Sequence, residues 1–142
     1  MTEQWAQQLD LLIRAGTPLI WIRSHEEERV ESLLSQAVER LPGRRLATWD
    51  FVSGLSGVLG SEGLGARQPM VVLQWLQDLG GASPTLLLLK GVQRFCADPG
   101  SARMLRNLTS LLRGRPHTLV LGCGSWTPPT DLEEALTLLD LP

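Results

Sequence analysis

The chain has 142 residues, of which 43% are hydrophobic and 20% charged, a composition typical of a single folded domain and not of a disordered or fibrous protein. A formal net charge of -2 gives no overall attraction to nucleic acid or to an anionic membrane, and the longest apolar runs, 18–22 and 86–89, are too short to cross a bilayer. Its two cysteines match no metal-ligand or redox spacing. We therefore expect a cytoplasmic protein with no membrane, nucleic-acid or metal partner.

Helices and strands are predicted to alternate along the chain. Helical apolar spacing predicts one helix that ends at Gly16 and others at 24–41, 69–79, 98–112 and after Thr130. Short apolar runs between them predict strands at 19–22, 46–52, 85–92, 118–121 and 136–141. Because most of these strands are continuous apolar runs, the pattern indicates a parallel sheet with helices on both faces. Residues 1–142 are thus expected to form one three-layer α/β/α domain.

Local signals predict where some of these elements begin. Ser24 and Glu27 have the spacing of a capping box, and Thr130 with Glu133 repeats it. Asp98 before Pro99 predicts another helix cap. Glycine recurs without an apolar period across 54–68, so this segment is predicted to be a loop.

The last part of the chain carries a family resemblance. A strand at 118–121, a polar turn, the run Pro-Pro-Thr-Asp-Leu and a strand that ends Leu-Asp-Leu-Pro follow one another closely. This order resembles AAA ATPase cores from the sensor-1 strand to the last strand of the large subdomain. With the stretches 18–30, 48–55 and 86–95, the chain resembles the N-terminal domain of uncharacterised AAA ATPase-like proteins of cyanobacteria and red-algal plastids.

The resemblance implies a fold and a context. It implies a P-loop NTPase-like core whose five-stranded parallel sheet has the AAA/RecA-like order 5-1-4-3-2. In that family such a domain precedes a standard ATPase module, so Pro142 would mark either a domain boundary in a longer protein or merely the end of the segment.

The phosphate-binding part of such a core is degenerate here. A working Walker loop needs glycines whose backbone N–H groups surround the phosphates, a lysine, and a Ser/Thr hydroxyl for magnesium. The first strand instead passes into its helix through Arg23 and Ser24, and the acidic run Glu26, Glu27 and Glu28 follows. The glycine spacing of 60–65 is closer to the motif, but Ala66 and Arg67 stand where Lys and Ser/Thr belong.

The magnesium side is degenerate too. In working AAA sites the third strand ends in Asp-Glu, whereas this strand ends in Lys90-Gly91. A cation there opposes magnesium binding, and Lys90 is the only lysine in the chain. We therefore expect no catalytic residues, no cofactor and no enzyme activity from this domain alone.

Two functions from different classes remain. The first is a pseudo-ATPase domain for interaction, assembly or regulation of an attached or partner AAA module, with Glu26, Glu27, Glu28 and Trp126 as candidate contact residues. Trp126 is equally open to packing on the core. The alternative is a nucleotide-binding sensor or hydrolase that uses unconventional residues at the carboxyl edge of the sheet, where the candidates are Asp50, Lys90, Asp98 and Ser125.

The remaining polar residues favour no other activity. His25 and His117 have no predicted nucleophile and acid beside them, so the sequence does not indicate a catalytic triad. Arginines on or just beyond one helix, at 103, 106, 113 and 115, are expected to form a solvated face.

Overall fold

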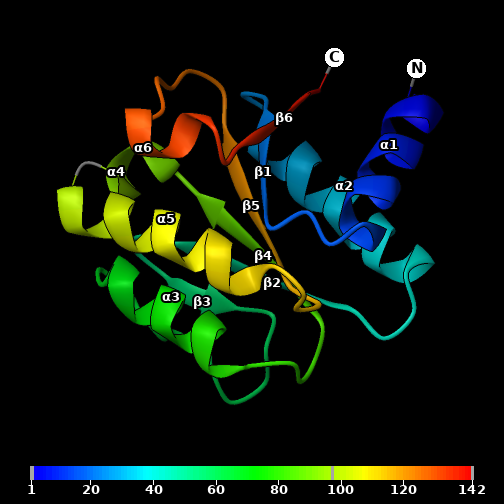
Figure 1. Cartoon of the computed structure of the whole chain (residues 1–142). Coiled ribbons are helices and arrows are strands. Elements are labelled where there is room, and N and C mark those ends of the chain that lie inside the picture. The colour runs from blue at the N-terminus through cyan, green and yellow to red at the C-terminus, as the bar shows by residue number, and fades with distance from the viewer. Residues whose placement is uncertain (1, 97, 142) are drawn as a thin grey trace.

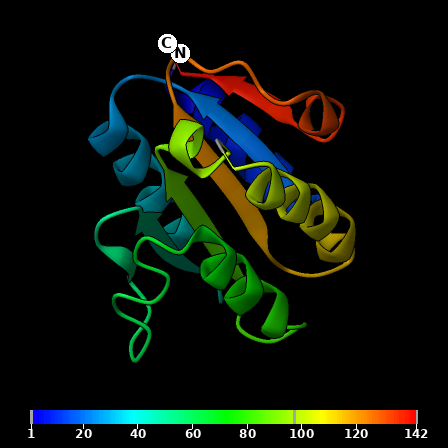
Figure 2. The same ribbon diagram turned by 90° about the vertical axis from the view of Figure 1, so that its left-hand side faces the viewer.

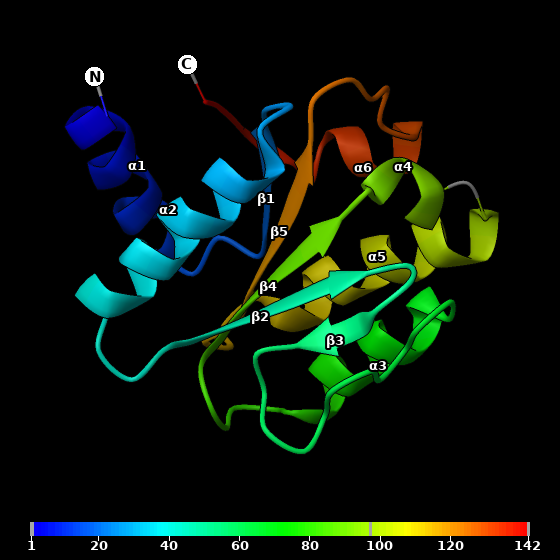
Figure 3. The ribbon, with the colours of Figure 1, turned by 180° about the vertical axis from the view of Figure 1, so that it is seen from behind.

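One mixed sheet with helices on both faces organises the chain (Figure 1). The computed structural model describes residues 2–96 and 98–141. Its six strands are β1 (Leu19–Arg23), β2 (Arg45–Asp50), β3 (Gly54–Ser56), β4 (Thr85–Lys90), β5 (Thr118–Cys123) and β6 (Thr137–Asp140). They lie in the order β3-β2-β4-β5-β1-β6. Neighbours from β2 to β6 pair in parallel, whereas β3 pairs antiparallel with β2 (Figure 3).

The α/β class is confirmed, but the expected five-stranded, purely parallel sheet is wrong. The sheet has a sixth strand, β3, which lies within the segment that the sequence predicts as a loop. The strand β3 has only three residues, and Leu55 is the single apolar side chain among them. So short a segment has no apolar pattern that could reveal a strand. Backbone bonds hold the rest of the hairpin: Leu55 N–H donates to the Leu64 carbonyl at 2.9 Å, and Gly63 N–H donates to Leu55 at 2.8 Å.

Within the described residues, six helices surround the sheet. They are α1 (Thr2–Arg14), α2 (Glu27–Arg40), α3 (Pro69–Asp78), α4 (Val92–Phe95), α5 (Pro99–Leu112) and α6 (Thr130–Glu133). The helices α1 and α2 pack on one face, and α3, α5 and α6 lie on the other (Figure 2). No helix within the described ranges is both long enough and apolar enough to span a bilayer.

The alternation of strand side chains explains the two cores. Leu87 and Leu89 of β4 point to the α3 and α5 side, whereas Leu86 and Leu88 point to the α1 and α2 side. All four are almost completely buried. A strand with apolar residues at every position therefore needs helices on both faces, as the sequence predicts.

His117 fixes the amino-terminal edge of the sheet, immediately before β5. Its ring is fully buried, Nδ1 accepts a hydrogen bond from Thr85 N–H at 3.2 Å, and Nε2 lies 2.8 Å from the Gly80 carbonyl. These partners require the neutral tautomer with the proton on Nε2. Burial lowers the pKa of His117 from its ordinary value of 6.5; the Gly80 hydrogen bond opposes this shift, and two nearby arginines add to it.

The lowered pKa predicts a pH dependence of stability. The contribution of neutral His117 is fully present above a pH of about 6.5 and decreases as the pH falls from there toward the folded-state pKa, because the unfolded chain binds the proton more readily. We expect urea unfolding between pH 7.5 and 5.5 to show a steeper loss of stability for the wild type than for His117→Gln. Equal pH slopes for the two proteins would contradict this prediction.

Candidate functional site

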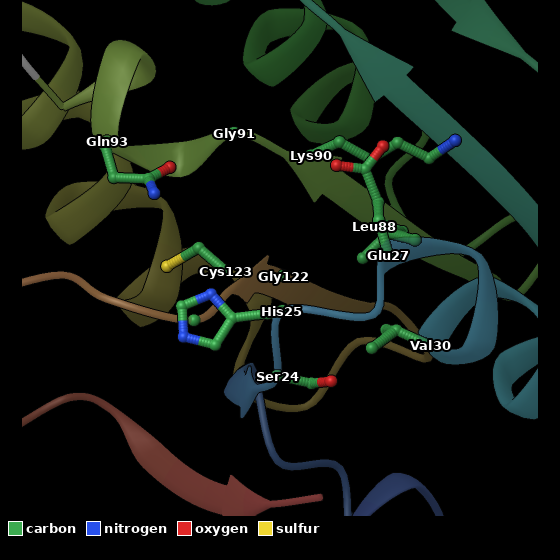
Figure 4. A pocket seen from close by; sticks show the side chains of 11 residues that line it. Ser24, His25, Glu27, Val30, Leu88, Lys90, Gly91, Gln93, Gly122 and Cys123 are labelled. Atoms are coloured by element: carbon green, nitrogen blue, oxygen red, sulfur yellow. The ribbon is translucent and has the colours of Figure 1, made fainter.

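A pocket of about 240 Å³ opens at the carboxyl edge of the parallel strands, where folds of this kind place their ligands (Figure 4). Three segments of chain build it: the β1–α2 connection, the end of β4 with α4, and the end of β5. Its lining residues are Ser24, His25, Glu27, Val30, Leu88, Lys90, Gly91, Gln93, Gly122, Cys123 and Gly124.

The β1–α2 connection is a short turn. It contains only Ser24, His25 and Glu26 between Arg23 and the start of α2. Ser24 N–H donates to the Cys123 carbonyl at 3.2 Å, which ties the turn to β5. The His25 ring lies directly over Gly124, where a Cβ would be only 2.2 Å from His25 Nδ1.

The predicted capping box at Ser24 and Glu27 is wrong. The helix α2 begins at Glu27, and its N-cap residue is Glu26, which makes no side-chain capping bond. The Ser24 hydroxyl oxygen accepts instead from Glu26 N–H at 3.0 Å, a bond within the turn. Local bonding to the nearest amide has therefore displaced the cap by two residues.

The predicted capping box at Thr130 and Glu133 is also wrong, whereas the predicted cap at Asp98 is confirmed. Thr130 lies inside α6, whose N-cap residue Pro129 makes no side-chain capping bond. Asp98 is the N-cap of α5, as predicted, and its carboxylate accepts from Ser101 N–H at 3.0 Å.

Negative charge surrounds the turn. Glu26, Glu27 and Glu28 are all exposed, and Glu27 also lines the pocket. Glu26 forms an ion pair with Arg29 at 2.8 Å, one turn along the helix. Acidic side chains in a first helical turn stabilise the helix dipole themselves and repel an incoming phosphate.

Lys90 is the cation of the pocket, and α2 neutralises it. Lys90 Nζ lies 2.5 Å from Glu31 Oε1, and the lysine side chain is only 20% exposed. In Figure 4 the ammonium group extends away from His25 and Gly122. The carboxyl end of β4 thus carries an ion-paired lysine.

The other three candidates for a ligand edge have local roles. Asp50 lies beside Lys90 at a second, shallower hollow, and its Oδ1 accepts from Val52 and Ser53 N–H at 2.9 and 2.7 Å. Asp98 caps α5 and does not line the pocket, nor does Ser125. The Ser125 carbonyl accepts a long bond of 3.4 Å from Gln93. The structure therefore brings Asp50 and Lys90 together but not the other two.

Trp126 packs on the core side of the β5–α6 connection. Its ring meets Trp21 edge to face at a centroid distance of 5.2 Å and remains half-buried. Trp21 Nε1 donates to the Cys123 carbonyl at 3.1 Å, which fixes this pair beside the pocket. The sequence left open whether Trp126 contacts a partner or packs on the core. Most of the ring packs on the core, and part of its surface stays accessible.

Sequence reasoning missed Cys123, Gln93 and the contact between His25 and Gly124. The one available signal was the Gly-Cys-Gly run at 122–124, because glycine at a strand end permits another group to approach closely. Burial raises the pKa of both Cys96 and Cys123 to about 11, so these thiols are protonated at neutral pH and poor nucleophiles. In residues 2–96 and 98–141, no cluster of three or more His, Cys, Asp or Glu side chains could hold a metal ion.

Comparison with known families decides where the chain belongs. The family model for the SpoVK-like AAA ATPase N-terminal domain matches residues 5–141. The chain belongs to this family. It is 32% identical over 138 residues to the uncharacterized AAA domain-containing protein ycf46 of Guillardia theta. The matched region covers 97% of this chain and 27% of that protein. The ycf46 protein of Trieres chinensis is 32% identical over 132 residues, with 93% and 27% covered.

These relatives confirm the family resemblance, and the chain spans about a quarter of their length. Solved structures share the fold. A chain of Drosophila ORC bound to AT-rich DNA and Cdc6 matches with a TM-score of 0.60 at 9% identity, over 98% of this chain and 53% of that one. A chain of Drosophila ORC bound to DNA gives 0.59 at 7% identity, over 98% and 88%. At these identities the likeness concerns the fold alone.

Proposed function

We propose that this SpoVK-like N-terminal domain is a non-catalytic AAA-like domain that serves interaction, assembly or regulation of an attached or partner AAA ATPase module. The ion pair between Lys90 and Glu31 carries the proposal. In a working site the end of this strand supplies carboxylates that hold magnesium and orient water. A lysine ammonium repels the metal, and the acid nearest to that ammonium already neutralises it.

The other half of a hydrolytic site supports the same conclusion. The turn of Ser24, His25 and Glu26 contains no glycine and no lysine, so it cannot wrap a triphosphate with backbone N–H groups. The His25 ring covers Gly124, and Glu27 places a carboxylate at the pocket wall. In this proposal, side chains that contact other parts of the domain take the places of the phosphate-binding loop and of the magnesium-binding carboxylates.

The interaction role is supported by the exposed surface beside the pocket and by the family. The three glutamates at 26–28 are exposed and present negative charge at the start of α2, and part of the Trp126 ring stays accessible on the β5–α6 connection. Exposed charges and a partly exposed aromatic ring are both features that suit a protein contact. Relatives are much longer than this chain and carry the name of AAA domain-containing proteins. An attached module in such a protein is the partner that we propose.

Two hydrolysis assays test the two halves of the proposal. The purified chain with ATP and magnesium should release no phosphate above buffer, and turnover abolished by Lys90→Ala would overturn the non-catalytic half. For the interaction half, the full-length Guillardia theta relative is compared with a form that lacks the matching quarter. We expect the ATPase rate to change on deletion and to recover when the missing domain is added back; identical rates in a form that remains folded would argue against it.

A further inference from the structure

A second, basic pocket lies at the amino-terminal edge of the parallel strands, opposite to the edge in Figure 4. It has a volume of about 310 Å³, and its lining residues come from the ends of α1 and β5 and from the connections α1–β1, α2–β2 and α5–β5. Arg14, Arg44 and Arg115 line it together with His117, and we call this set the arginine pocket. None of the described residues that line it is acidic.

The three arginines come from separate segments. Arg14 is the last residue of α1, Arg44 precedes β2, and Arg115 precedes β5. A basic residue in the last turn of a helix stabilises the helix dipole, which explains Arg14. Arg44 and Arg115 lie beyond the ends of α2 and α5, so the dipole does not explain why three arginines share one cavity.

The pocket arginines are not neutralised within the domain. Across residues 2–96 and 98–141, none of the three takes part in an ion pair; the nearest acid along α1, Asp10, is already held by Arg40 through bonds of 2.8 and 2.9 Å. Arg115 Nη1 donates to the Gln77 carbonyl at 3.2 Å, which fixes its guanidinium at the pocket. Arg14 is exposed and Arg44 half-buried, so both heads are accessible to a ligand.

His117, a buried residue that lines the pocket, has a pKa that nearby arginines help to lower. Burial is the main cause of the lowered pKa of His117, and Arg115 and Arg45 lower the pKa further through their charges. The lowered pKa favours neutral His117, so the charged side chains that line the pocket are its three arginines.

We propose that the arginine pocket binds a compact phosphate-bearing anion, either inorganic phosphate or a small phosphomonoester. Guanidinium groups match phosphate oxygens with paired N–H donors, and such charge-assisted bonds are the strong ones. A cavity of about 310 Å³ is at the small end of ligand pockets, so the phosphate carries at most a small organic group. The site is independent of the proposed function, because it lies at the other edge of the sheet from Lys90.

The test is a titration of the purified chain with inorganic phosphate and with ribose 5-phosphate, at constant ionic strength set with sodium chloride. Backbone amide NMR reports the location, and thermal unfolding reports the strength. We expect saturable shifts of the amide signals of Gly16 and Gly114, which line the pocket. Equal affinity for both probes identifies free phosphate as the ligand class, whereas tighter ribose 5-phosphate binding identifies an organic phosphate; either supports the proposal.

Paired variants decide whether the arginines act as a site. Arg14→Ala with Arg44→Ala should weaken binding on the order of tenfold or more, since charge-assisted bonds are lost. The control, Arg103→Ala with Arg113→Ala, removes the same charge from exposed positions outside the pocket and should leave binding unchanged. Shifts that do not saturate, or an equal loss in both double variants that fold with wild-type midpoints, would overturn the proposal. Lys90→Ala should not alter phosphate binding, so this test and the nucleotide tests fail separately.

Discussion

Replacing Trp49 with alanine should lower the free energy of unfolding by about 3–5 kcal/mol, the range for deletion of a large buried aromatic side chain. Trp49 is 1% exposed and lies at the centre of an aromatic cluster, edge to face with Phe95 at 5.5 Å and with Phe51 at 6.5 Å. Its Nε1 also donates to the Gly65 carbonyl at 3.0 Å, which anchors the glycine-rich segment to β2. The melting midpoint should therefore fall by roughly 10 °C or more.

Two variants separate the causes of that loss. Trp49→Phe keeps an aromatic ring in the core but removes the N–H donor, and we expect it to cost less than the alanine variant. Trp75→Ala removes a half-buried tryptophan from α3 and should also cost less. Urea unfolding of all three provides the measurement; a Trp49→Ala variant no less stable than Trp75→Ala would contradict the place of Trp49 at the centre of the core.

Gly54→Ala is expected to destabilise the domain by more than about 2 kcal/mol, because a strained backbone and a steric clash add together. Gly54 has a φ of +69°, and a Cβ there would lie 2.5 Å from the Gly63 carbonyl oxygen and 2.9 Å from Ala66 N. Both contacts are with backbone atoms, so no side-chain rotation can relieve them. The substitution should therefore separate the β3 hairpin from the segment that returns across it.

Gly60→Ala is the matched control within the same segment. Gly60 has a φ of +84°, but nothing lies within 4 Å of the position of its Cβ. Alanine there carries the backbone strain without the clash, at a cost of about 1 kcal/mol. Chemical denaturation should rank Gly54→Ala well below Gly60→Ala in stability, and equal losses would show that the close approach to Gly63 carries no energy.

The sequence predicts the buried framework well because burial on both faces leaves a simple pattern. Continuous apolar runs in β1, β4 and β5 indicate parallel strands, and the cap at Asp98 is signalled by a local bond to Ser101 N–H. The strand β3 is not visible, since it has only three residues, one of them glycine, and is held by backbone bonds to β2, Leu64 and Gly63. An apolar pattern cannot report the backbone pairing of so short a segment.

The candidate site shows the same division. The sequence itself shows that the residues between β1 and α2 include no glycine and no lysine, and that a lysine ends β4. The Lys90–Glu31 ion pair and the stacking of His25 on Gly124 depend on how α2 and β5 lie in space. The capping box at Ser24 fails because its motif fits the spacing, while the turn offers Ser24 a nearer amide in Glu26.

Thermal unfolding of the purified chain with and without millimolar ATP, in magnesium and in EDTA, tests the central claim most directly. A specific nucleotide site filled at a hundred times its dissociation constant would add about 2.7 kcal/mol to the free energy of unfolding. We predict no rise in midpoint that requires magnesium, in the wild type or in Lys90→Ala. A magnesium-dependent rise in the wild type that disappears in Lys90→Ala would show that the carboxyl edge of the sheet binds nucleotide, and would contradict the claim that both halves of a nucleotide site are lost.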